Sequence, residues 1–251
     1  MCGIIAAASN RNVGKLLVQG LHKMEYRGYD SAGIALHQTD QIAHLRTLGK
    51  VKLLEEKMIA EKPKSKLGIA HTRWATHGEP SEENAHPHMS NERVYIVHNG
   101  IIENYLDLKD FLKKEGYSFS SQTDSELIAH LLEYFLNKGN NMLDSMYLTK
   151  EKLDGAYAIA AIDKEDDQNI IIARSKSPLL IGIGMDEFLA ASDPLAIGQL
   201  TNEFIFLEDG DVAELSSETC TIFDESKKKV EREISQIDIS SQATSKGEYR
   251  H

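Results

Sequence analysis

The run Cys2-Gly3-Ile4-Ile5-Ala6-Ala7-Ala8 directly follows Met1 and consists of a cysteine followed only by small or apolar residues. A short continuous apolar run of this kind is typical of a strand that is buried on both faces. We therefore expect residues 2–8 to form a buried strand that holds the start of the chain deep inside the fold.

Cys2 itself combines two reactive groups if the initiator methionine is removed, because one residue then carries a thiol and a free α-amine. The small side chain at position 2 favours that removal. An α-amine has a reference pKa of about 7.7 to 8.0, so it is suited to take the proton of a thiol near neutral pH. Cys2 is thus a candidate nucleophile with a base a few bonds away, although a cysteine in second position is by itself also consistent with chance.

The composition limits the class of protein. With 251 residues, 41% hydrophobic and 27% charged, the chain is typical of one large globular domain. It has 28 basic and 39 acidic residues, a net charge of −11, which argues against nucleic acid as a partner. No apolar stretch approaches the roughly 20 residues of a membrane span and no signal peptide is recognisable, so we predict a cytoplasmic protein without membrane contact.

The two cysteines of the chain, Cys2 and Cys220, are too few for a disulfide framework or a cluster of metal ligands. Cys220 lies in the alternating run 218–223, which is typical of a strand, so we interpret it as a structural thiol.

Helices and short strands alternate in the first half of the sequence. Apolar residues at helical spacing predict a helix from about residue 13 to 24, and a charged helix is expected over residues 51–60. Thr123 and Glu126 match a capping box for a third helix that runs to Lys138 and stops at Gly139. Strands are predicted at 34–37, 42–47, 68–72 and 94–98, and the glycine-punctuated segment 25–33 is predicted as a loop.

From residue 156 onward the pattern changes to short β runs, at 156–163, 169–174, 179–184, 188–191, 204–207, 212–215 and 219–224. Many short strands with few helices predict an α+β fold, in which two antiparallel sheets pack together and helices lie outside. The polar residues that follow have the composition of a linker, so we predict one domain over residues 1–239 and the start of a linker over 240–251.

Three polar segments follow strand ends and carry groups suited to acyl chemistry. In His71-Thr72-Arg73-Trp74-Ala75-Thr76-His77-Gly78-Glu79-Pro80 the arginine is able to bind a carboxylate through two parallel hydrogen bonds, with hydroxyl and imidazole donors beside it. In the segment 97–104 the amide of Asn99 and the next backbone N–H are arranged as in an oxyanion hole, and Gly100 permits close approach of a substrate. Asp124 has two open interpretations, as a partner for a substrate ammonium group or as a solvated helix cap.

Taken together these segments resemble the glutaminase domain of the isomerizing glutamine:fructose-6-phosphate aminotransferases, which are class II, or N-terminal-nucleophile, amidotransferases. The matching stretches are CGIIAAA, EYRGYDSAGIAL, GIAHTRWATHGEPSEENAHPH, IVHNGIIENYLDLK, QTDSELIAHLL, LDGAYAIAAID, ARSKSPLLIGIG, ASDPLAI and FLEDGDVAEL. They run from residue 2 to about residue 215.

The resemblance implies a four-layer αββα sandwich of the N-terminal-nucleophile hydrolase type. It implies that Cys2 is the nucleophile, that Asn99 and Gly100 form the oxyanion hole, and that Arg27 and Gly28 belong to the active-site loop. For the substrate it implies the following contacts: Arg73, Thr76 and His77 to the α-carboxylate, Asp124 and Gly100 to the α-amine, and Trp74 to the amide end.

The reaction implied by the resemblance is hydrolysis of L-glutamine to glutamate and ammonia through a γ-glutamyl thioester, with no metal and no cofactor. In the full-length enzymes the ammonia serves glucosamine 6-phosphate synthesis from fructose 6-phosphate. The expected partners are therefore the sugar-isomerase domains of a longer chain, which this sequence lacks, and that longer chain is expected to form a homo-oligomer.

Other interpretations compete with this one. The chain is also compatible with the glutaminase domain of another class II amidotransferase, such as amidophosphoribosyltransferase. In a different class, His71, His77, His86 and His88 are candidate ligands of a hydrolytic metal, although their spacing matches no compact zinc motif. A third alternative is an amino-acid sensor that keeps the pocket without the chemistry.

Overall fold

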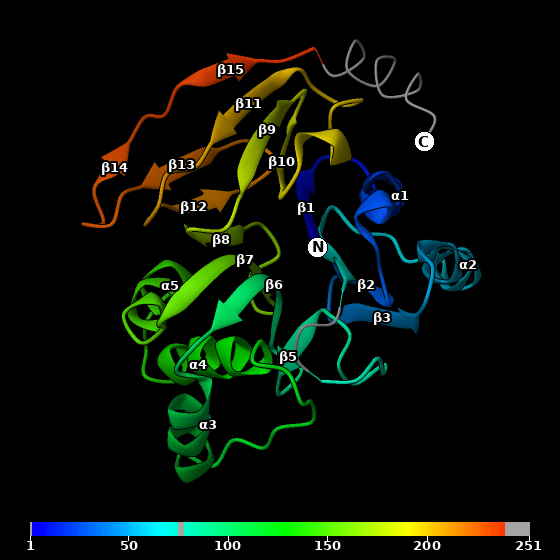
Figure 1. The fold of residues 1–251 in the computed structure, drawn as a ribbon. Coiled ribbons are helices and arrows are strands. Elements are labelled where there is room, and N and C mark those ends of the chain that lie inside the picture. Colours follow the sequence, from blue (N-terminus) through cyan, green and yellow to red (C-terminus); the bar gives the residue numbers. More distant parts are fainter. Residues whose placement is uncertain (1, 75–77, 239–251) are drawn as a thin grey trace, which may run out of the picture.

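The computed structural model describes residues 2–74 and 78–238. Two antiparallel β-sheets pack face to face, and helices cover both outer faces (Figure 1). This arrangement confirms the predicted α+β sandwich. The predicted linker over residues 240–251 lies outside the described residues, so the domain boundary stays a prediction.

The first sheet has eight strands and contains the start of the chain. Its order is β15 (Ile234–Gln236), β11 (Glu203–Phe206), β9 (Leu180–Gly184), β10 (Glu187–Ala191), β1 (Gly3–Ser9), β4 (Leu67–Arg73), β2 (Ser31–His37) and β3 (Ile42–Leu48). Strand β1 pairs with β10 on one side and β4 on the other, so Cys2 lies at the beginning of an interior strand.

The second sheet has seven strands. Its order is β14 (Lys229–Val230), β13 (Cys220–Phe223), β12 (Val212–Leu215), β8 (Ile170–Ser175), β7 (Gly155–Asp163), β6 (Val94–Ile102) and β5 (His88–Ser90). Strand β6 pairs along its whole length with β7, from Val94 opposite Asp163 to Ile102 opposite Gly155.

The helices divide between the two outer faces. Those beside the eight-stranded sheet are α1 (Gly14–Met24), α2 (Val51–Glu61) and the 3₁₀ turns η1 (Glu25–Arg27) and η2 (Pro194–Ala196). Those beside the seven-stranded sheet are α3 (Tyr105–Lys114), α4 (Glu126–Leu136) and α5 (Met142–Lys150). The order of the layers is therefore helices, sheet, sheet, helices, as the resemblance implied (Figure 1).

Strand β1 shows why this sequence builds three apolar layers. Successive side chains of a strand point to opposite faces. Ile5 and Ala7 therefore pack against the helices α1 and α2, whereas Ile4 and Ala6 enter the layer between the two sheets. A third apolar layer joins the seven-stranded sheet to α3, α4 and α5. Because both faces of β1 are buried, an uninterrupted apolar run is what this position requires.

The start of α4 differs from the predicted capping box. Ser125, not Thr123, precedes the first helical residue, and the helix ends at Leu136, before the predicted end at Lys138. The Thr123 hydroxyl lies 2.9 Å from Nε2 of His88, and the Glu126 carboxylate accepts hydrogen bonds from the backbone N–H groups of Ser120 and Ser121. Both side chains of the expected box thus have other partners.

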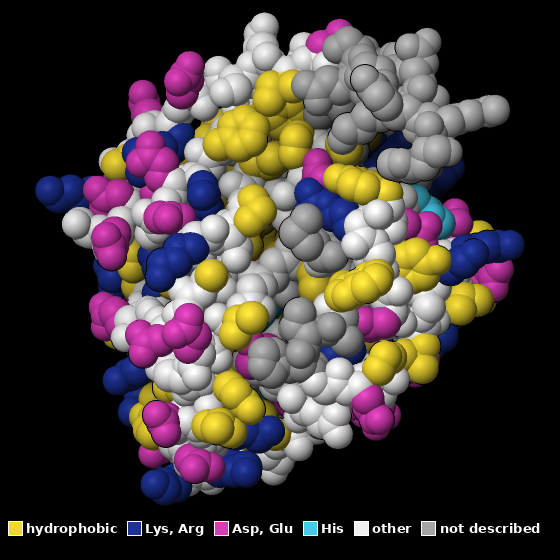
Figure 2. All heavy atoms as spheres, in the orientation of Figure 1, with side chains coloured by type: hydrophobic (Ala, Val, Ile, Leu, Met, Phe, Trp, Pro, Cys, Tyr) yellow, Lys and Arg dark blue, Asp and Glu magenta, His cyan; other side chains and the backbone are white. Residues whose placement is uncertain are grey.

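None of the helices within the described ranges is long and apolar enough to cross a bilayer. On the face shown in Figure 2, acidic and basic side chains are mixed along the periphery, and hydrophobic side chains gather toward the middle and upper part.

Candidate active site

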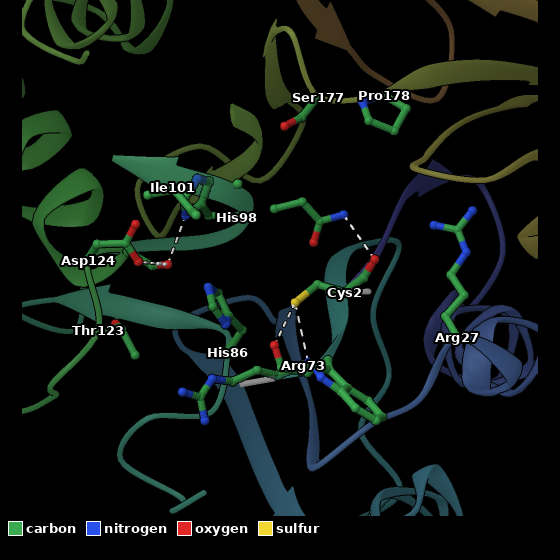
Figure 3. A pocket seen from close by; sticks show the side chains of 14 residues that line it. Cys2, Arg27, Arg73, His86, His98, Ile101, Thr123, Asp124, Ser177 and Pro178 are labelled. Atoms are coloured by element: carbon green, nitrogen blue, oxygen red, sulfur yellow. Dashed lines mark hydrogen bonds between the residues drawn. The ribbon is translucent and has the colours of Figure 1, made fainter. Parts of the chain in front are cut away.

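A cavity of about 440 Å³ opens where β1 begins and where β4 and β6 end (Figure 3). Its volume lies in the range of small-molecule sites. The lining residues come from both sheets and from the loops beside them: Cys2, Arg27, Arg73, Trp74, His86, His98, Asn99, Gly100, Ile101, Thr123, Asp124, Ser125, Ser177 and Pro178.

The thiol of Cys2 is held against the end of β4. The backbone N–H of Trp74 donates to Cys2 Sγ at 3.3 Å, and Sγ lies 3.5 Å from the carbonyl oxygen of the same residue. Burial raises the pKa of the Cys2 thiol, and the Trp74 N–H opposes that rise. Near neutral pH the sulfur is therefore protonated, and a base is needed before it becomes a nucleophile.

Arg73 is a buried cation at the cavity wall, with only 4% of its side chain exposed. Its Nη2 donates to the carbonyl oxygen of Gly78 at 3.1 Å, and Nη1 lies 3.4 Å from a carboxylate oxygen of Asp30. These contacts fix the plane of the guanidinium, which is the geometry that a two-pronged carboxylate contact requires.

Asp124 is a buried anion on the loop before α4. One carboxylate oxygen accepts the backbone N–H of Ile102 at 2.8 Å, which ties this loop to the end of β6. Next to it, Ser125 Oγ lies 2.8 Å from Nδ1 of His98. Burial lowers the pKa of His98 to about 4, so this imidazole is neutral at physiological pH.

Asn99 and Gly100 are consecutive residues of β6 at the cavity. The side-chain amide Nδ2 of Asn99 donates to the carbonyl oxygen of Cys2 at 3.3 Å. Gly100 has φ of +136°, and a Cβ built on it would lie 1.9 Å from the carbonyl oxygen of Ala156. Only glycine fits there, because both the backbone angle and the neighbouring strand exclude a side chain.

Arg27 and Gly28 lie at the cavity mouth with Trp74. The guanidinium of Arg27 is paired with Asp193, which also accepts a hydrogen bond from the Tyr26 hydroxyl at 2.7 Å. A Cβ on Gly28, whose φ is +89°, would lie 1.9 Å from the Trp74 ring. The loop backbone therefore packs directly against the half-exposed indole.

The charged side chains of the cavity are distributed unevenly around Cys2. Arg73 and Asp124 lie on one side of Cys2, and Arg27 lies on the other (Figure 3). A ligand with a carboxylate and an ammonium group at one end would thus bind both charges on one side and place its other end at the sulfur.

The structure brings most of the predicted site residues together. The following line the cavity: Cys2, Arg27, Arg73, Trp74, Asn99, Gly100 and Asp124. Gly28 is not part of the lining but contacts Trp74. Thr76 and His77 lie outside the described residues.

Several residues at the site were not assigned from the sequence. Ser177 and Pro178 line the cavity from the loop before β9, and Asp193 anchors Arg27 from the segment before η2. Ser177 and Pro178 belong to the stretch ARSKSPLL and Asp193 to the stretch ASDPLAI. Both stretches resemble the amidotransferases, and that resemblance was the available indication.

Within residues 2–74 and 78–238 no group of three or more His, Cys, Asp or Glu side chains is arranged to hold a metal ion. His71, His86 and His88 pack against one another as a buried cluster of rings, with centroids 4.1 Å apart for the tilted pair His71–His86 and 4.5 Å apart for the edge-to-face pair His86–His88. His77, the fourth ligand of the metal hypothesis, lies outside the described residues.

Comparison with known proteins places this arrangement in a class. A structure of glutamine phosphoribosylpyrophosphate amidotransferase from B. subtilis, in complex with ADP and GMP, matches 89% of this chain with a TM-score of 0.77 and 25% identity, and 49% of its own chain is covered. A glutamine aminotransferase class-II domain protein from Silicibacter pomeroyi shares the fold at 16% identity, with a TM-score of 0.61 over 89% of this chain and 99% of its own. The sandwich is thus the fold of the class II glutamine amidotransferases.

Sequence comparison leads to the family. The family described as glutamine amidotransferase domain matches residues 71–199, and the chain belongs to it. Two curated relatives, the glutamine–fructose-6-phosphate aminotransferases [isomerizing] of Shewanella oneidensis and Haemophilus ducreyi, are 48% and 49% identical over the whole of this chain. The chain spans 41% of the length of each of these relatives.

Proposed function

We propose that this domain hydrolyses L-glutamine to L-glutamate and ammonia, with Cys2 as the nucleophile. The observation that carries the proposal is the placement of a buried cation, Arg73, and a buried anion, Asp124, on the same side of the thiol. These two groups complement the α-carboxylate and the α-ammonium of an amino acid. The side-chain amide of a glutamine bound in this way extends toward Cys2.

The α-amine of Cys2, which becomes free when Met1 is removed, is the group whose pKa best suits it to take the proton of the thiol. Burial raises the pKa of the thiol above its usual value. The buried imidazoles nearby are poor acceptors of that proton, because their pKa values are lowered to about 3 for His71 and about 4 for His98. An α-amine has a reference pKa of about 8, much closer to that of the thiol.

The steps follow from these groups. The amine takes the thiol proton, through a water molecule, and the sulfur attacks the amide carbon of glutamine. The oxyanion that forms accepts hydrogen bonds from the side chain of Asn99 and the backbone of Gly100. The leaving nitrogen takes a proton and departs as ammonia, which leaves a γ-glutamyl thioester. Water then attacks the thioester carbon and releases glutamate and the thiol.

The remaining predicted contacts belong to the same proposal. Thr76 and His77 add hydrogen bonds to the α-carboxylate, Trp74 contacts the amide end, and Arg27 with Gly28 holds the loop at the mouth. Neither a metal nor an organic cofactor has a step in this reaction.

The 48% identity to isomerizing aminotransferases supports a place in amino-sugar synthesis over the amidophosphoribosyltransferase alternative. We propose that in a longer protein, whose remaining part corresponds to the unmatched length of the relatives, sugar-isomerase domains use the ammonia to convert fructose 6-phosphate into glucosamine 6-phosphate. A homo-oligomeric full-length protein and a cytoplasmic location stay predictions.

The deciding experiment compares two forms of the chain that differ only at the N-terminus. Protein with Met1 removed, verified by intact mass, should release glutamate and ammonia from glutamine, whereas protein with a blocked Cys2 amine should be inactive though folded by circular dichroism. A tag after His251 serves as the control and should be harmless. Full activity with a blocked amine would require another base, and no ammonia from the processed form would favour the amino-acid sensor.

The sugar assignment has its own test. This chain, supplied with glutamine and fructose 6-phosphate, should produce glutamate and ammonia but no glucosamine 6-phosphate. Amino-sugar formation by this chain alone would place the sugar site within it and contradict the proposal.

A further inference from the structure

The side chain of Asn99 connects the two sheets beside the reactive thiol. Asn99 belongs to β6 of the seven-stranded sheet, whereas Cys2 immediately precedes β1 of the eight-stranded sheet and His71 lies on β4 of that sheet. Nδ2 of Asn99 lies 3.3 Å from the carbonyl oxygen of Cys2, and Oδ1 lies 2.9 Å from Nε2 of His71. One carboxamide thus spans the gap between the sheets with a partner at each end.

The donors and acceptors of Cys2, Asn99 and His71 are compatible with only one placement of the protons. The carbonyl oxygen of Cys2 is only an acceptor, so the atom of Asn99 that faces it is the NH₂ group. The other end of the carboxamide is then the oxygen, which is also only an acceptor. Nε2 of His71 must therefore carry a proton and donate it to Asn99 Oδ1.

The surroundings of His71 keep the ring neutral, so that this proton defines a tautomer. His71 is fully buried, and burial lowers its pKa to about 3, although the bond to Asn99 opposes that shift. A neutral imidazole has a single N–H. With the proton on Nε2, Nδ1 has none.

The orientation of the carboxamide decides what Asn99 offers to the cavity. The NH₂ group has two N–H bonds, and one of them is directed at the carbonyl of Cys2. The second is available to the cavity that Asn99 lines. If the carboxamide turned by 180°, its oxygen would face both the Cys2 carbonyl and an oxyanion formed at the sulfur, and both contacts would be repulsive.

We propose that His71, as the Nε2–H tautomer, is a positioning residue that holds the Asn99 carboxamide with its N–H toward the oxyanion formed at Cys2. His71 acts through Asn99 and does not touch the substrate. This role rests on the proposed glutamine hydrolysis, and it gives a purpose to a histidine that the sequence offered only as a metal ligand.

The kinetic test uses three variants with verified processed N-termini. His71→Phe keeps the buried ring but removes the donor, and loss of an oriented oxyanion donor lowers kcat by about 100-fold or more. We expect that loss with KM within about threefold, and we expect His71→Gln, which carries an N–H near the position of Nε2, to recover most of the rate. The matched control is His37→Phe, a buried histidine at the opposite end of the same sheet, where its Nε2 contacts the carbonyl of Lys164. It should retain kcat within about twofold.

A second measurement separates orientation of Asn99 from general damage to the thiol. L-Glutamate γ-semialdehyde forms a thiohemiacetal with Cys2, whose oxygen occupies the position of the oxyanion. Its affinity should fall in His71→Phe in proportion to kcat, whereas the rate of Cys2 alkylation by iodoacetamide, which forms no oxyanion, should stay within about twofold of wild type.

The tautomer itself is measurable without activity. In ¹⁵N NMR spectra of the wild-type chain, the ring of His71 should show a protonated Nε2 and a bare Nδ1 at pH 7. A ring protonated on Nδ1, or a folded His71→Phe with unchanged kcat, would overturn the positioning role. A processed wild type that does not hydrolyse glutamine would instead overturn the proposed function, so the two failures are distinguishable.

Discussion

The two sheets contribute different halves of the site, and they fix their contributions in different ways. In the eight-stranded sheet, Cys2 and Arg73 are the next residues beyond the Gly3–Thr72 pair of the antiparallel neighbours β1 and β4. The backbone register of β1 and β4 therefore sets the relative positions of the two residues from which the thiol and the guanidinium extend. In the seven-stranded sheet, Asn99 is on β6, but Asp124 lies on a loop that is tied to the strand through the backbone of Ile102.

The distance between the two halves depends on a third kind of contact. Among the residues that the structure describes, no backbone ladder joins one sheet to the other. The apolar layer between the sheets and side-chain bonds across it hold them together, among them the bonds of Asn99 to Cys2 and His71 and that of His37 to the carbonyl of Lys164. The site should be most sensitive where a side chain that joins the sheets also lines the cavity, as Asn99 does.

The largest effect is expected from removing the reactive atom of the eight-stranded sheet. Cys2→Ala should abolish ammonia release, because no other group forms the thioester, while the fold survives since β1 already accommodates alanines. Ammonia release and circular dichroism are the measurements. Near wild-type release would show that the nucleophile is elsewhere.

The second largest effect is expected from changing the charged groups that bind the substrate, one from each half of the site. Arg73→Lys loses a two-pronged contact and Asp124→Asn loses a charge-assisted contact, so each should lower kcat/KM for glutamine by roughly 10- to 100-fold, mainly through KM. Arg11→Lys is the matched control, because Arg11 pairs with Glu187 at the far end of β1. If Arg73→Lys and Asp124→Asn unfold readily while their folded fractions bind glutamine normally, both charges are structural.

A smaller effect concerns stability, and it tests the neutral histidines around the gap between the sheets. Burial lowers the pKa of His71 and of His88 to about 3 and that of His98 to about 4. Unfolded histidine has a pKa of about 6.5, so below that pH the unfolded chain binds more protons than the folded chain. The stability from these rings is fully present above pH 6.5, and it is lost as the pH falls to about 4 for His98 and to about 3 for His71 and His88.

Urea denaturation at pH 7.5, 6 and 5 measures this loss. Each buried histidine contributes a slope of up to about 1.4 kcal/mol per pH unit. His88→Gln should show a shallower dependence than wild type. A free energy of unfolding that stays level between pH 7.5 and 5 would contradict the assignment of neutral rings.

The smallest effect is expected at the second cysteine. Cys220 is half-buried on β13, away from the cavity, and burial raises the pKa of its thiol to about 11. Cys220→Ser should therefore change glutamine hydrolysis by less than about twofold. A marked loss of activity in this variant would mean that the outer strands of the seven-stranded sheet influence the site.

The sequence predicted the strands better than the helices. The β runs from residue 156 onward agree with β7 to β13 to within one or two residues, because alternation and turn residues delimit each of them. Helices α3 and α5 were not predicted. Only Leu108 and Leu112 of α3 are buried, so its apolar stripe is narrow, and the apolar residues of α5 do not concentrate on one face.

For the site, the sequence predicted residues that carry reactive groups themselves, such as Cys2 and Arg73. It did not predict residues that act through a neighbour. Asp193 lies 166 positions from Arg27, and the His71–Asn99 bond joins different sheets, so neither pairing follows from local spacing. Such contacts exist only once the sandwich has formed.

The backbone of Gly28 and Gly100 also sets a limit for anyone who wishes to redesign the cavity. A single added methyl group at either position would lie 1.9 Å from its neighbour, the Trp74 ring in one case and the Ala156 carbonyl in the other. Neither position accepts a side chain unless that neighbour is displaced. Ser177 and Pro178, which line the cavity with their side chains from the loop before β9, are the better positions at which to change the size of the ligand (Figure 3).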